Sequence, residues 1–156
     1  MKSLKSVTIR TATKSDVECI VRLANAGGPN GKPRSVLPKV LPQAYFHTFR
    51  KIKGDPNQML MVAEVGSEIV GTFHLTFLTY LAAAGKEDCQ IEAVHVDQRY
   101  RNQGIGTQMM KWAIDTAKKR ECRRVQLTSN KERVDAHRFY KRLGFVMSHE
   151  GAKFLI

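Results

Sequence analysis

Apolar and polar residues alternate, or apolar residues dominate, in several short stretches of the chain, and this pattern is typical of β-strands. Two of these stretches are separated only by Gly66 and Ser67, which predicts a tight hairpin between them. The apolar residues within 145–156 predict one or two further short strands at that end. The strands expected before residue 145 are 7–13, 58–65, 68–81, 90–96 and 123–129.

Other stretches carry apolar residues at intervals of three and four, which predicts amphipathic helices. The first helix is expected to begin near Ser15, because Ser15 and Glu18 have the spacing of a capping box. Gly and Pro crowd into 27–33 and end this helix, so 27–42 is expected to be a long loop. The order of strands and helices predicts an α/β domain with a mixed sheet. The other expected helices are 42–51, one from Gly104 onward, and 134–143.

The composition of the chain is that of a soluble globular protein. A length of 156 residues suits one compact domain, expected to span 1–156, and a hydrophobic content of 42% suits a proper core. No apolar run approaches the roughly 20 residues that span a bilayer, and no apolar signal core follows the basic start. Cys19, Cys89 and Cys122 lie far apart without a Cys-x-x-Cys motif, which favours reduced thiols. We therefore expect a cytoplasmic protein without a membrane partner.

Charge is unevenly distributed along the chain, whose net charge is +12. Residues 1–57 hold 11 basic and 3 acidic side chains, residues 58–100 hold 2 and 6, and residues 101–156 hold 13 and 5. A basic excess suits nucleic acid, a membrane surface or a phosphorylated ligand, and it equally suits an ordinary solvated surface. Charge alone therefore leaves the class of partner open.

The segment 101–106, Arg-Asn-Gln-Gly-Ile-Gly, lies between an expected strand and a strongly patterned helix. Amides in the first turn of a helix lack partners within the helix and favour anions, and Arg101 adds a cation that can pair with phosphate. A Gly-x-Gly before a helix is also compatible with an ordinary tight turn, so spacing alone leaves both interpretations open. The segment lacks the Gly-Lys-Ser/Thr of a nucleotide P-loop and the third glycine of a dinucleotide fingerprint.

Several segments together resemble one known family. The segment 101–106 fits the pattern Arg/Gln-x-x-Gly-x-Gly/Ala of the GNAT superfamily of N-acetyltransferases, and 91–101 before it is similar to the family's fourth strand. The segment 136–145 resembles the family's Ala-x-x-Phe-Tyr-x-x-x-Gly-Phe. The order of elements also agrees, although the N-terminal third agrees in pattern only. The chain looks most similar to bacterial small-molecule members, including those that acetylate aminoalkylphosphonates.

The resemblance implies a GNAT-like α/β fold: a mixed, mostly antiparallel twisted sheet of six to seven strands, flanked by about four helices. It further implies that strands 4 and 5 splay apart at a bulge, where the pantetheine arm of acetyl-CoA inserts. Acetyl-CoA is thus the expected cosubstrate, and no metal is expected because the five histidines lack zinc spacing. The residues implied to bind acetyl-CoA are Val94, His95, Val96, Arg101, Asn102, Gln103, Gly104, Ile105, Gly106, Asn130 and Tyr140.

The resemblance also implies a catalytic base. Glu92 corresponds to the acidic residue that many family members carry in this strand, although a carboxylate paired with Lys or Arg explains it equally well. Strict alternation would place Glu92, Val94 and Val96 on one face of the strand. It would place His95, the second candidate base, on the other face, where an ordinary hydrogen-bonded histidine is the alternative.

A catalytic acid is implied as well. Tyr140 corresponds to the tyrosine that many members direct at the coenzyme sulfur, and its alternative role is packing, which Phe139 is expected to take instead. Asn130 fits the asparagine that binds pantetheine, with one departure, because Ala136 follows six residues later where three is typical. The backbone amides of 94–96 would polarise the acetyl carbonyl.

The expected function is transfer of acetyl from acetyl-CoA to a primary amine of a small molecule, by direct attack in a ternary complex. Lys32, Arg34 and Lys39 lie in the long loop that helps to wall the acceptor site in this fold, and they favour an acceptor with an anionic group. The alternatives are acetylation of a protein lysine or N-terminus and, from another class, a basic nucleic-acid-binding module. No stacking or helix-turn-helix motif is found, so no nucleic-acid partner is expected, and a homodimer is left open.

Overall fold

The computed structural model of the chain describes residues 6–28 and 32–156, so that 29–31 of the expected long loop lie outside the described residues. It consists of two compact units, Met1–Gln126 and Leu127–Ile156. The first unit contains nearly all of a β-sheet and the helices that cover it. The second contains one further helix and the C-terminal segment.

The sheet of the first unit has five strands, which lie side by side in their order along the chain. The first four run antiparallel to their neighbours. The fifth begins beside the start of the fourth, where the Arg123 N–H donates to the Glu87 carbonyl at 2.8 Å, so these two strands run in the same direction. The strands are β1 (Thr8–Thr11), β2 (Gln58–Val65), β3 (Glu68–Thr79), β4 (Glu87–Val96) and β5 (Arg124–Leu127).

Two helices pack on one face of this sheet. α1 (Val17–Ala26) and α2 (Gln43–Gly54) contribute Val17 and Phe49 to an apolar cluster with Val62 of β2. A short 3₁₀ turn, η1 (Lys14–Asp16), leads into α1. Val62 pairs with Thr72 of β3, and directly opposite residues share a face, so even-numbered positions of β3 near Thr72 face α1 and α2.

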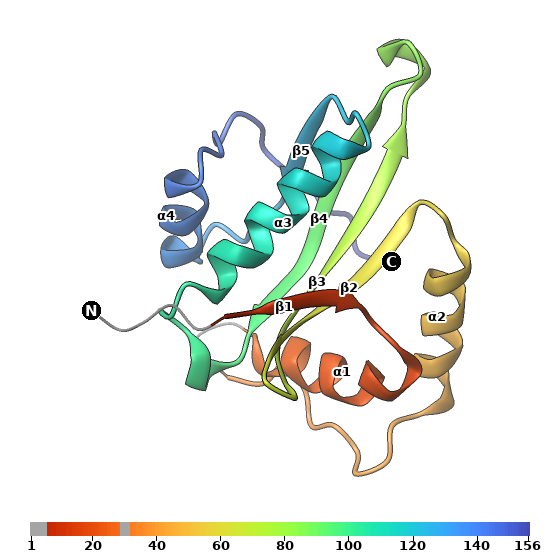
Figure 1. Cartoon of the computed structure of the whole chain (residues 1–156), viewed down its shortest axis with the longest axis vertical. Helices are drawn as coiled ribbons and strands as arrows, with labels where there is room; N and C mark the ends of the chain where they lie inside the picture. The colour runs from red at the N-terminus through yellow and green to blue at the C-terminus, as the bar shows by residue number, and fades with distance from the viewer. Residues whose placement is uncertain (1–5, 29–31) are drawn as a thin grey trace. The chain divides into compact units, whose positions relative to one another are not determined.

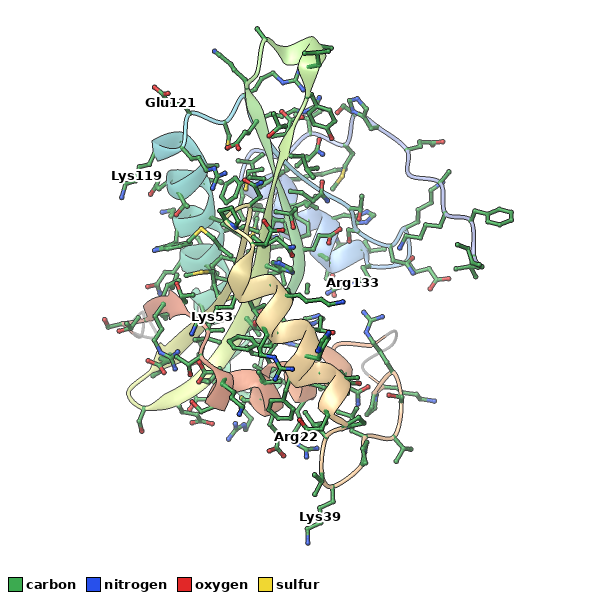
Figure 2. The ribbon with its side chains drawn as sticks, turned by 90° about the vertical axis from the view of Figure 1, so that its right-hand side faces the viewer. Arg22, Lys39, Lys53, Lys119, Glu121 and Arg133 are labelled. Carbon is green, nitrogen blue, oxygen red and sulfur yellow. The ribbon has the colours of Figure 1, made fainter. Side chains whose placement is uncertain are left out.

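A third helix packs on the opposite face. Trp112 of α3 (Ile105–Lys119) meets Phe73 of β3 edge-on, with ring centroids 5.8 Å apart. Figure 2 shows α3, with Lys119 near its end, to the left of the strands. β3 and β4 form a long hairpin that extends beyond the other strands and carries the 3₁₀ turn η3 (Leu81–Ala83) at its tip (Figure 1). The second unit contains α4 (Val134–Arg142).

The expected hairpin is confirmed, because β2 and β3 pair through a turn at Gly66 and Ser67. The expected six to seven strands are wrong, and the difference lies in 145–156, where no strand forms. A strand needs a neighbouring strand for its backbone groups, but the Ser148 N–H donates to the nearby Val146 carbonyl instead. Phe154 is 92% exposed, so the apolar pattern at this end reflects no core burial either. The splaying of β4 and β5 beyond their paired starts stays a prediction.

The start of the first helix also differs from the prediction, since Ser15 and Glu18 form no capping pair. The capping box lies two residues earlier, where the Thr13 N–H donates to the Asp16 carboxylate at 2.7 Å, and η1 follows. Glu18 accepts a hydrogen bond from Arg22, one turn along α1, at 2.7 Å. Because Thr13 and Asp16 have the same spacing as Ser15 and Glu18, the sequence was compatible with both registers.

Asp16 should stabilise the fold in a pH-dependent way. Its carboxylate is 7% exposed and accepts hydrogen bonds from Arg10 at 2.6 and 3.0 Å, which lower its pKa from 3.8 to about 2. A carboxylate whose pKa is lowered on folding stabilises the folded protein at pH values above its pKa in the unfolded chain, and this stability is lost as pH falls through its pKa in the folded protein. Asp16→Asn should therefore remove about 2 kcal/mol from the free energy of unfolding at pH 7. Urea unfolding at pH 7 and at pH 2 measures this, and the difference from the wild type should shrink at pH 2.

The matched control is Asp115→Asn, on the exposed side of α3, which should change the free energy of unfolding little at either pH. An Asp16→Asn deficit of equal size at both pH values would contradict the ion pair as its cause.

The three cysteines are free in the structure, in agreement with the sequence-based expectation of reduced thiols. Cys89 is buried within β4, and burial raises the pKa of its thiol to about 12, so it stays protonated at neutral pH. Among the described helices, none combines the length and the apolar character that crossing a bilayer would require.

Candidate active site

β4 carries a bulge near its end. Its register with β3 pairs Glu92 with His74 and His95 with Thr72, which leaves Ala93 and Val94 together opposite a single residue of β3. Ala93 has φ 50°, the left-handed conformation that such extra residues often take. A bulge bends the strand and redirects the side chains that follow it, so this point of the sheet is where a ligand-binding irregularity can form.

The bulge overturns one sequence-based expectation. His74 and Thr72 are two residues apart and share a face of β3, so their partners Glu92 and His95 also share a face. Val96 instead pairs with Gly71, on the face that α3 covers, where the Cβ position of Gly71 is 2.8 Å from the Met109 sulfur. The expected grouping of Glu92 with Val96, and His95 opposite, is therefore wrong. One inserted residue reverses the alternation beyond it.

The end of α1 lies against His95. A Cβ placed on Gly27 would be 2.2 Å from the His95 Nδ1, so only glycine allows this approach. The loop that follows is held to the same helix end, because the Asn25 side chain donates to the Ser35 carbonyl at 2.9 Å and accepts from the Ser35 N–H at 3.0 Å. The Arg34 N–H also donates to the Asn25 carbonyl at 2.9 Å. The described part of the loop thus starts beside the face that bears Glu92 and His95.

His74 is a residue that the sequence reasoning missed. It is half-buried, and its Nε2 is buried without a hydrogen-bond partner among the described residues. Burial lowers the pKa of its imidazole, while the charge of Glu92 raises it in part. The available signal was a single histidine within the otherwise apolar and threonine-rich 68–81. Glu92 opposite it is exposed.

The turn between β4 and α3 leaves the helix N-terminus open. After the 3₁₀ turn η4 (Gln98–Tyr100), Asn102 has φ 59° and Gly104 has φ 80°, both left-handed. Gly104 is the N-cap of α3 and supplies no side-chain cap, so the first amides of α3 keep their capacity to bind an anion. Ile105 is buried, at 1% exposure, so its side chain belongs to the core and is not a ligand contact.

Two side chains of the turn hold it in shape. Arg101 Nε donates to the Val96 carbonyl at 3.1 Å, and Gln103 Nε2 donates to the Arg99 carbonyl at 3.0 Å. Arg101 is exposed, and its two terminal nitrogens make no hydrogen bond within the described part of the chain. Arg101 therefore links the turn to the end of β4 and keeps two donors for a ligand.

Glu68 at the start of β3 braces the same turn. It accepts hydrogen bonds from Arg99 and from the Tyr100 hydroxyl, both at 2.5 Å. The Tyr100 hydrogen bond, followed by that of Arg99, lowers the pKa of Glu68. Arg99 also pairs with Asp97, the N-cap of η4, at 2.8 Å. These contacts were not foreseen from the sequence, since they join segments about 30 residues apart.

The second unit contains the other two residues expected at the site. The side-chain oxygen of Asn130 accepts a hydrogen bond from the Glu132 N–H at 2.9 Å. The backbone carbonyl of Asn130 accepts one from the Arg133 N–H at 3.0 Å, so Asn130 shapes the turn before α4. Ser129 Oγ and His137 Nε2 are buried without partners among the described residues. These two groups were missed by sequence reasoning, and buried polar atoms of this kind call for a ligand or water.

Tyr140 is the most buried residue of α4, at 7% exposure. Its ring contacts Phe139, with centroids 5.2 Å apart, and Phe145 edge-on at 5.8 Å. Phe139 is only half-buried, so the expectation that Phe139 takes the core role and leaves Tyr140 free is wrong. Burial raises the pKa of the Tyr140 phenol. Its hydroxyl therefore stays protonated at neutral pH.

The described residues contain no group of three or more metal-ligating side chains. The bulge, the open helix N-terminus and the braced turn between them are an arrangement suited to an anionic ligand. A match to a protein family indicates the kind of ligand. Residues 32–145 match the acetyltransferase (GNAT) family. The chain belongs to this family, and it is an acetyltransferase.

Enzymes of the GNAT family use acetyl-CoA as cosubstrate and act on an amine acceptor. The chain is 32% identical, over 91% of its length, to an uncharacterized N-acetyltransferase of Methanocaldococcus jannaschii, and spans 62% of that protein. It is 34% identical over 69% of its length to the aminoalkylphosphonate N-acetyltransferase of Salmonella typhimurium, and spans 69% of it. A Bacillus halodurans crystal structure described as a transcriptional regulator matches with TM-score 0.89 and 45% identity, covering 97% of this chain and all of that one.

Proposed function

We propose that the chain transfers acetyl from acetyl-CoA to a primary amine of a small molecule, by direct attack in a ternary complex. The observation that carries the proposal is the pairing of the β4 bulge at Ala93 with the uncapped start of α3 at Gly104. A bulged strand offers backbone groups to an extended arm, and the helix start offers amides to a diphosphate. Both features lie within one segment of the GNAT match.

Acetyl-CoA would be held mainly by the backbone. The amides at 102–106 and the terminal nitrogens of Arg101 would bind the diphosphate, and Asn130 would bind the pantetheine arm. The amides of Val94, His95 and Val96 would polarise the acetyl carbonyl. Tyr140 would donate a proton to the departing sulfur, a role that requires 1–156 to act as one acetyltransferase domain.

The brace at Glu68 should tune coenzyme affinity without affecting the chemistry. Glu68→Gln weakens the contacts to Arg99 and Tyr100, and exposed pairs of this kind contribute little because solvent screens them. The dissociation constant of coenzyme A should therefore rise by no more than about fivefold, with kcat unchanged. Calorimetric titration and steady-state kinetics measure the two quantities. Glu121→Gln, at an exposed residue just beyond the end of α3 (Figure 2), is the matched control, and a lower kcat with unchanged affinity would refute the brace.

The acceptor must lose a proton before it can attack. An alkylamine with a pKa near 10.4 is neutral in only about one molecule in a few thousand at pH 7, so a proton acceptor contributes to the rate. Glu92 remains the sequence-based candidate for that acceptor. Its position beside the bulge, on the face that α1 and α2 cover, is compatible with the role.

The acceptor is proposed to carry an anionic group. Support comes from the Salmonella relative, named for aminoalkylphosphonates, and from the position of Arg34. A Cβ on Gly28 would be 3.1 Å from the Arg34 side chain, and its neighbour Gly27 contacts His95, so Arg34 belongs to the wall beside the acceptor face. Its guanidinium suits the bidentate recognition of a phosphonate or carboxylate.

Arg34→Gln should therefore affect anionic acceptors selectively. Loss of a charge-assisted pair should raise KM for an aminoalkylphosphonate about tenfold, and leave KM for the matching alkylamine without the anionic group nearly unchanged. Steady-state kinetics with both acceptors measure this. Lys39→Gln is the control, because Lys39 lies in the same loop and points away from the rest of the molecule (Figure 2). An equal loss with both acceptors would contradict the assignment.

The function itself is tested by thiol release from acetyl-CoA across a panel of primary amines. We expect release with amino acids or aminoalkylphosphonates, and acetylated product by mass spectrometry. If peptides with a free lysine or N-terminus are acetylated and small amines are not, a protein acceptor replaces the small molecule. If neither small amines nor peptides give thiol release, the proposal is rejected.

A nucleic-acid-binding function is the second candidate, and the observation that favours it is the Bacillus halodurans relative described as a transcriptional regulator. The net charge of +12 is compatible with it. Such binding would weaken steeply as salt rises, because phosphate contacts release counterions. Fluorescence anisotropy with duplex DNA at two salt concentrations distinguishes the two functions.

A further inference from the structure

His74 and Glu92 form a cross-strand pair on the face that α1 and α2 cover. They lie directly opposite each other on β3 and β4, at the last paired position before the bulge. The next pair beyond the bulge, Thr72 with His95, is on the same face, and His95 contacts the end of α1 at Gly27. Titratable groups on two strands are therefore gathered where the acceptor amine is proposed to lie.

The imidazole of His74 is suited to accept a proton. Its Nε2 is buried and makes no hydrogen bond to a described residue, and an unsatisfied buried nitrogen is unfavourable unless a ligand or water meets it. Burial lowers the pKa of this imidazole, so it is neutral at pH 7 and keeps a lone pair. Thr72, its neighbour on the same face, is already committed, because its hydroxyl donates to the Met61 carbonyl at 2.9 Å.

The surroundings of His74 contain few charges among the described residues. Leu60 of β2 pairs with it on the side away from Glu92, and Leu60 packs against the apolar cluster that contains Val62. On its own strand the same face carries Thr72 and Thr76, and β4 contributes Glu92 and His95. Glu92 is the charge that acts on the pKa of His74. The helical residues packed against the same cluster are apolar as well: Ile20 and Val21 of α1 and Phe46 of α2.

We propose that His74 accepts the proton of the acceptor ammonium, directly or through one water, while Glu92 attracts the ammonium and stabilises the imidazolium that forms. The proposal rests on the proposed N-acetyltransferase function. Once this proton is on Nε2, the lone pair of the amine nitrogen bonds to the acetyl carbonyl carbon, and the carbon–sulfur bond breaks with its electron pair leaving on sulfur. The second proton lost by nitrogen balances the one gained by sulfur. His74 returns its own proton to solvent.

The test uses His74→Gln and acceptors of different basicity. At pH 7 the variant should lose about 100-fold in kcat/KM for an alkylamine acceptor. The deficit should shrink below about tenfold for an acceptor whose own pKa is near 7, because half of that amine is already neutral. Above pH 7 the wild type should be nearly level, while kcat/KM of the variant should rise with the fraction of neutral amine. An equal loss with every acceptor would indicate a structural role and overturn the proposal.

Two measurements keep the test independent of activity. The first is binding, since coenzyme A should bind His74→Gln as tightly as the wild type. The matched control variant is His47→Gln, because His47 is exposed on α2 beside Arg50, and this variant should keep wild-type rates. In the wild type, the His74 ring protons should titrate by NMR below pH 6.5, and Glu92→Gln should lower that midpoint, since the carboxylate raises it. A midpoint that Glu92→Gln leaves unchanged overturns the pairing.

The failures are distinguishable. If the wild type acetylates no amine, the proposed function fails. If the wild type acetylates amines and His74→Gln matches it with all acceptors at pH 7, only the role of His74 fails.

Discussion

Replacing Gly104 with aspartate should weaken the binding of coenzyme A at least about 100-fold. Gly104 is the N-cap of α3, and the structure gives the first amides of this helix no side-chain cap. Aspartate is a strong N-cap residue, so its carboxylate would occupy the amides that a diphosphate would otherwise bind. It would also repel that diphosphate, since like charges about 4 Å apart near a protein surface cost on the order of 4 kcal/mol.

The control for this variant is Gly85→Asp. Gly85 has φ 76°, close to the 80° of Gly104, and a Cβ there would meet nothing within 4 Å. Both substitutions therefore impose the same left-handed backbone and the same added charge, and only one of them lies at the helix start. Calorimetric titration with coenzyme A measures the difference. Wild-type affinity in Gly104→Asp would remove the helix start from the binding site.

The sequence predicted the centre of the fold well because local signals there agree with one another. The hairpin of β2 and β3 has two strands rich in apolar residues and a two-residue turn between them, and its predicted start and end residues agree closely with the structure. The helix after Gly104 was equally clear, since Met109 and Met110 of its apolar stripe are fully buried. Predictions of this kind succeed where burial follows the period of the element.

The face assignment at β4 failed for a physical reason. Strict alternation treats every residue as one step along a regular strand, but Ala93 and Val94 together occupy one step opposite Phe73. Nothing in the side chain of Ala93 signals φ 50°, because the bulge is defined by pairing with β3. His74 was missed for the same reason. Its significance depends on Glu92, which is a neighbour only across the strands.

The end of the chain was predicted least well. Apolar residues in 145–156 suggested strands, but Val146 and Leu155 are 81% and 88% exposed, so here an apolar pattern does not coincide with burial. The choice between Phe139 and Tyr140 failed similarly. Both are aromatic and adjacent, and the helix rotation that buries Tyr140 is set by packing against Phe145, beyond the end of α4.

Tyr140→Phe should lower kcat about 100-fold or more while changing the dissociation constant of coenzyme A less than about threefold. Burial raises the pKa of the phenol, so it carries its proton throughout the neutral range and can supply it to the leaving thiolate. Phenylalanine keeps the ring and its contacts to Phe139 and Phe145, so the substitution removes only the hydroxyl. Steady-state kinetics and calorimetric titration measure the two effects, with the exposed Tyr80, which directly follows β3, changed to Phe as the control.

The burial of Tyr140 makes a packing role the competing explanation, and a second variant separates the two. Phe139→Leu removes the neighbouring ring and leaves the Tyr140 hydroxyl in place, so it should lower the free energy of unfolding by about 1 kcal/mol with little effect on kcat. If Tyr140→Phe behaves in the same way, with lower stability and a normal rate, the hydroxyl takes no part in catalysis. A large loss in kcat at unchanged stability is explained only by a proton that Tyr140 delivers, because the packing is the same in both proteins.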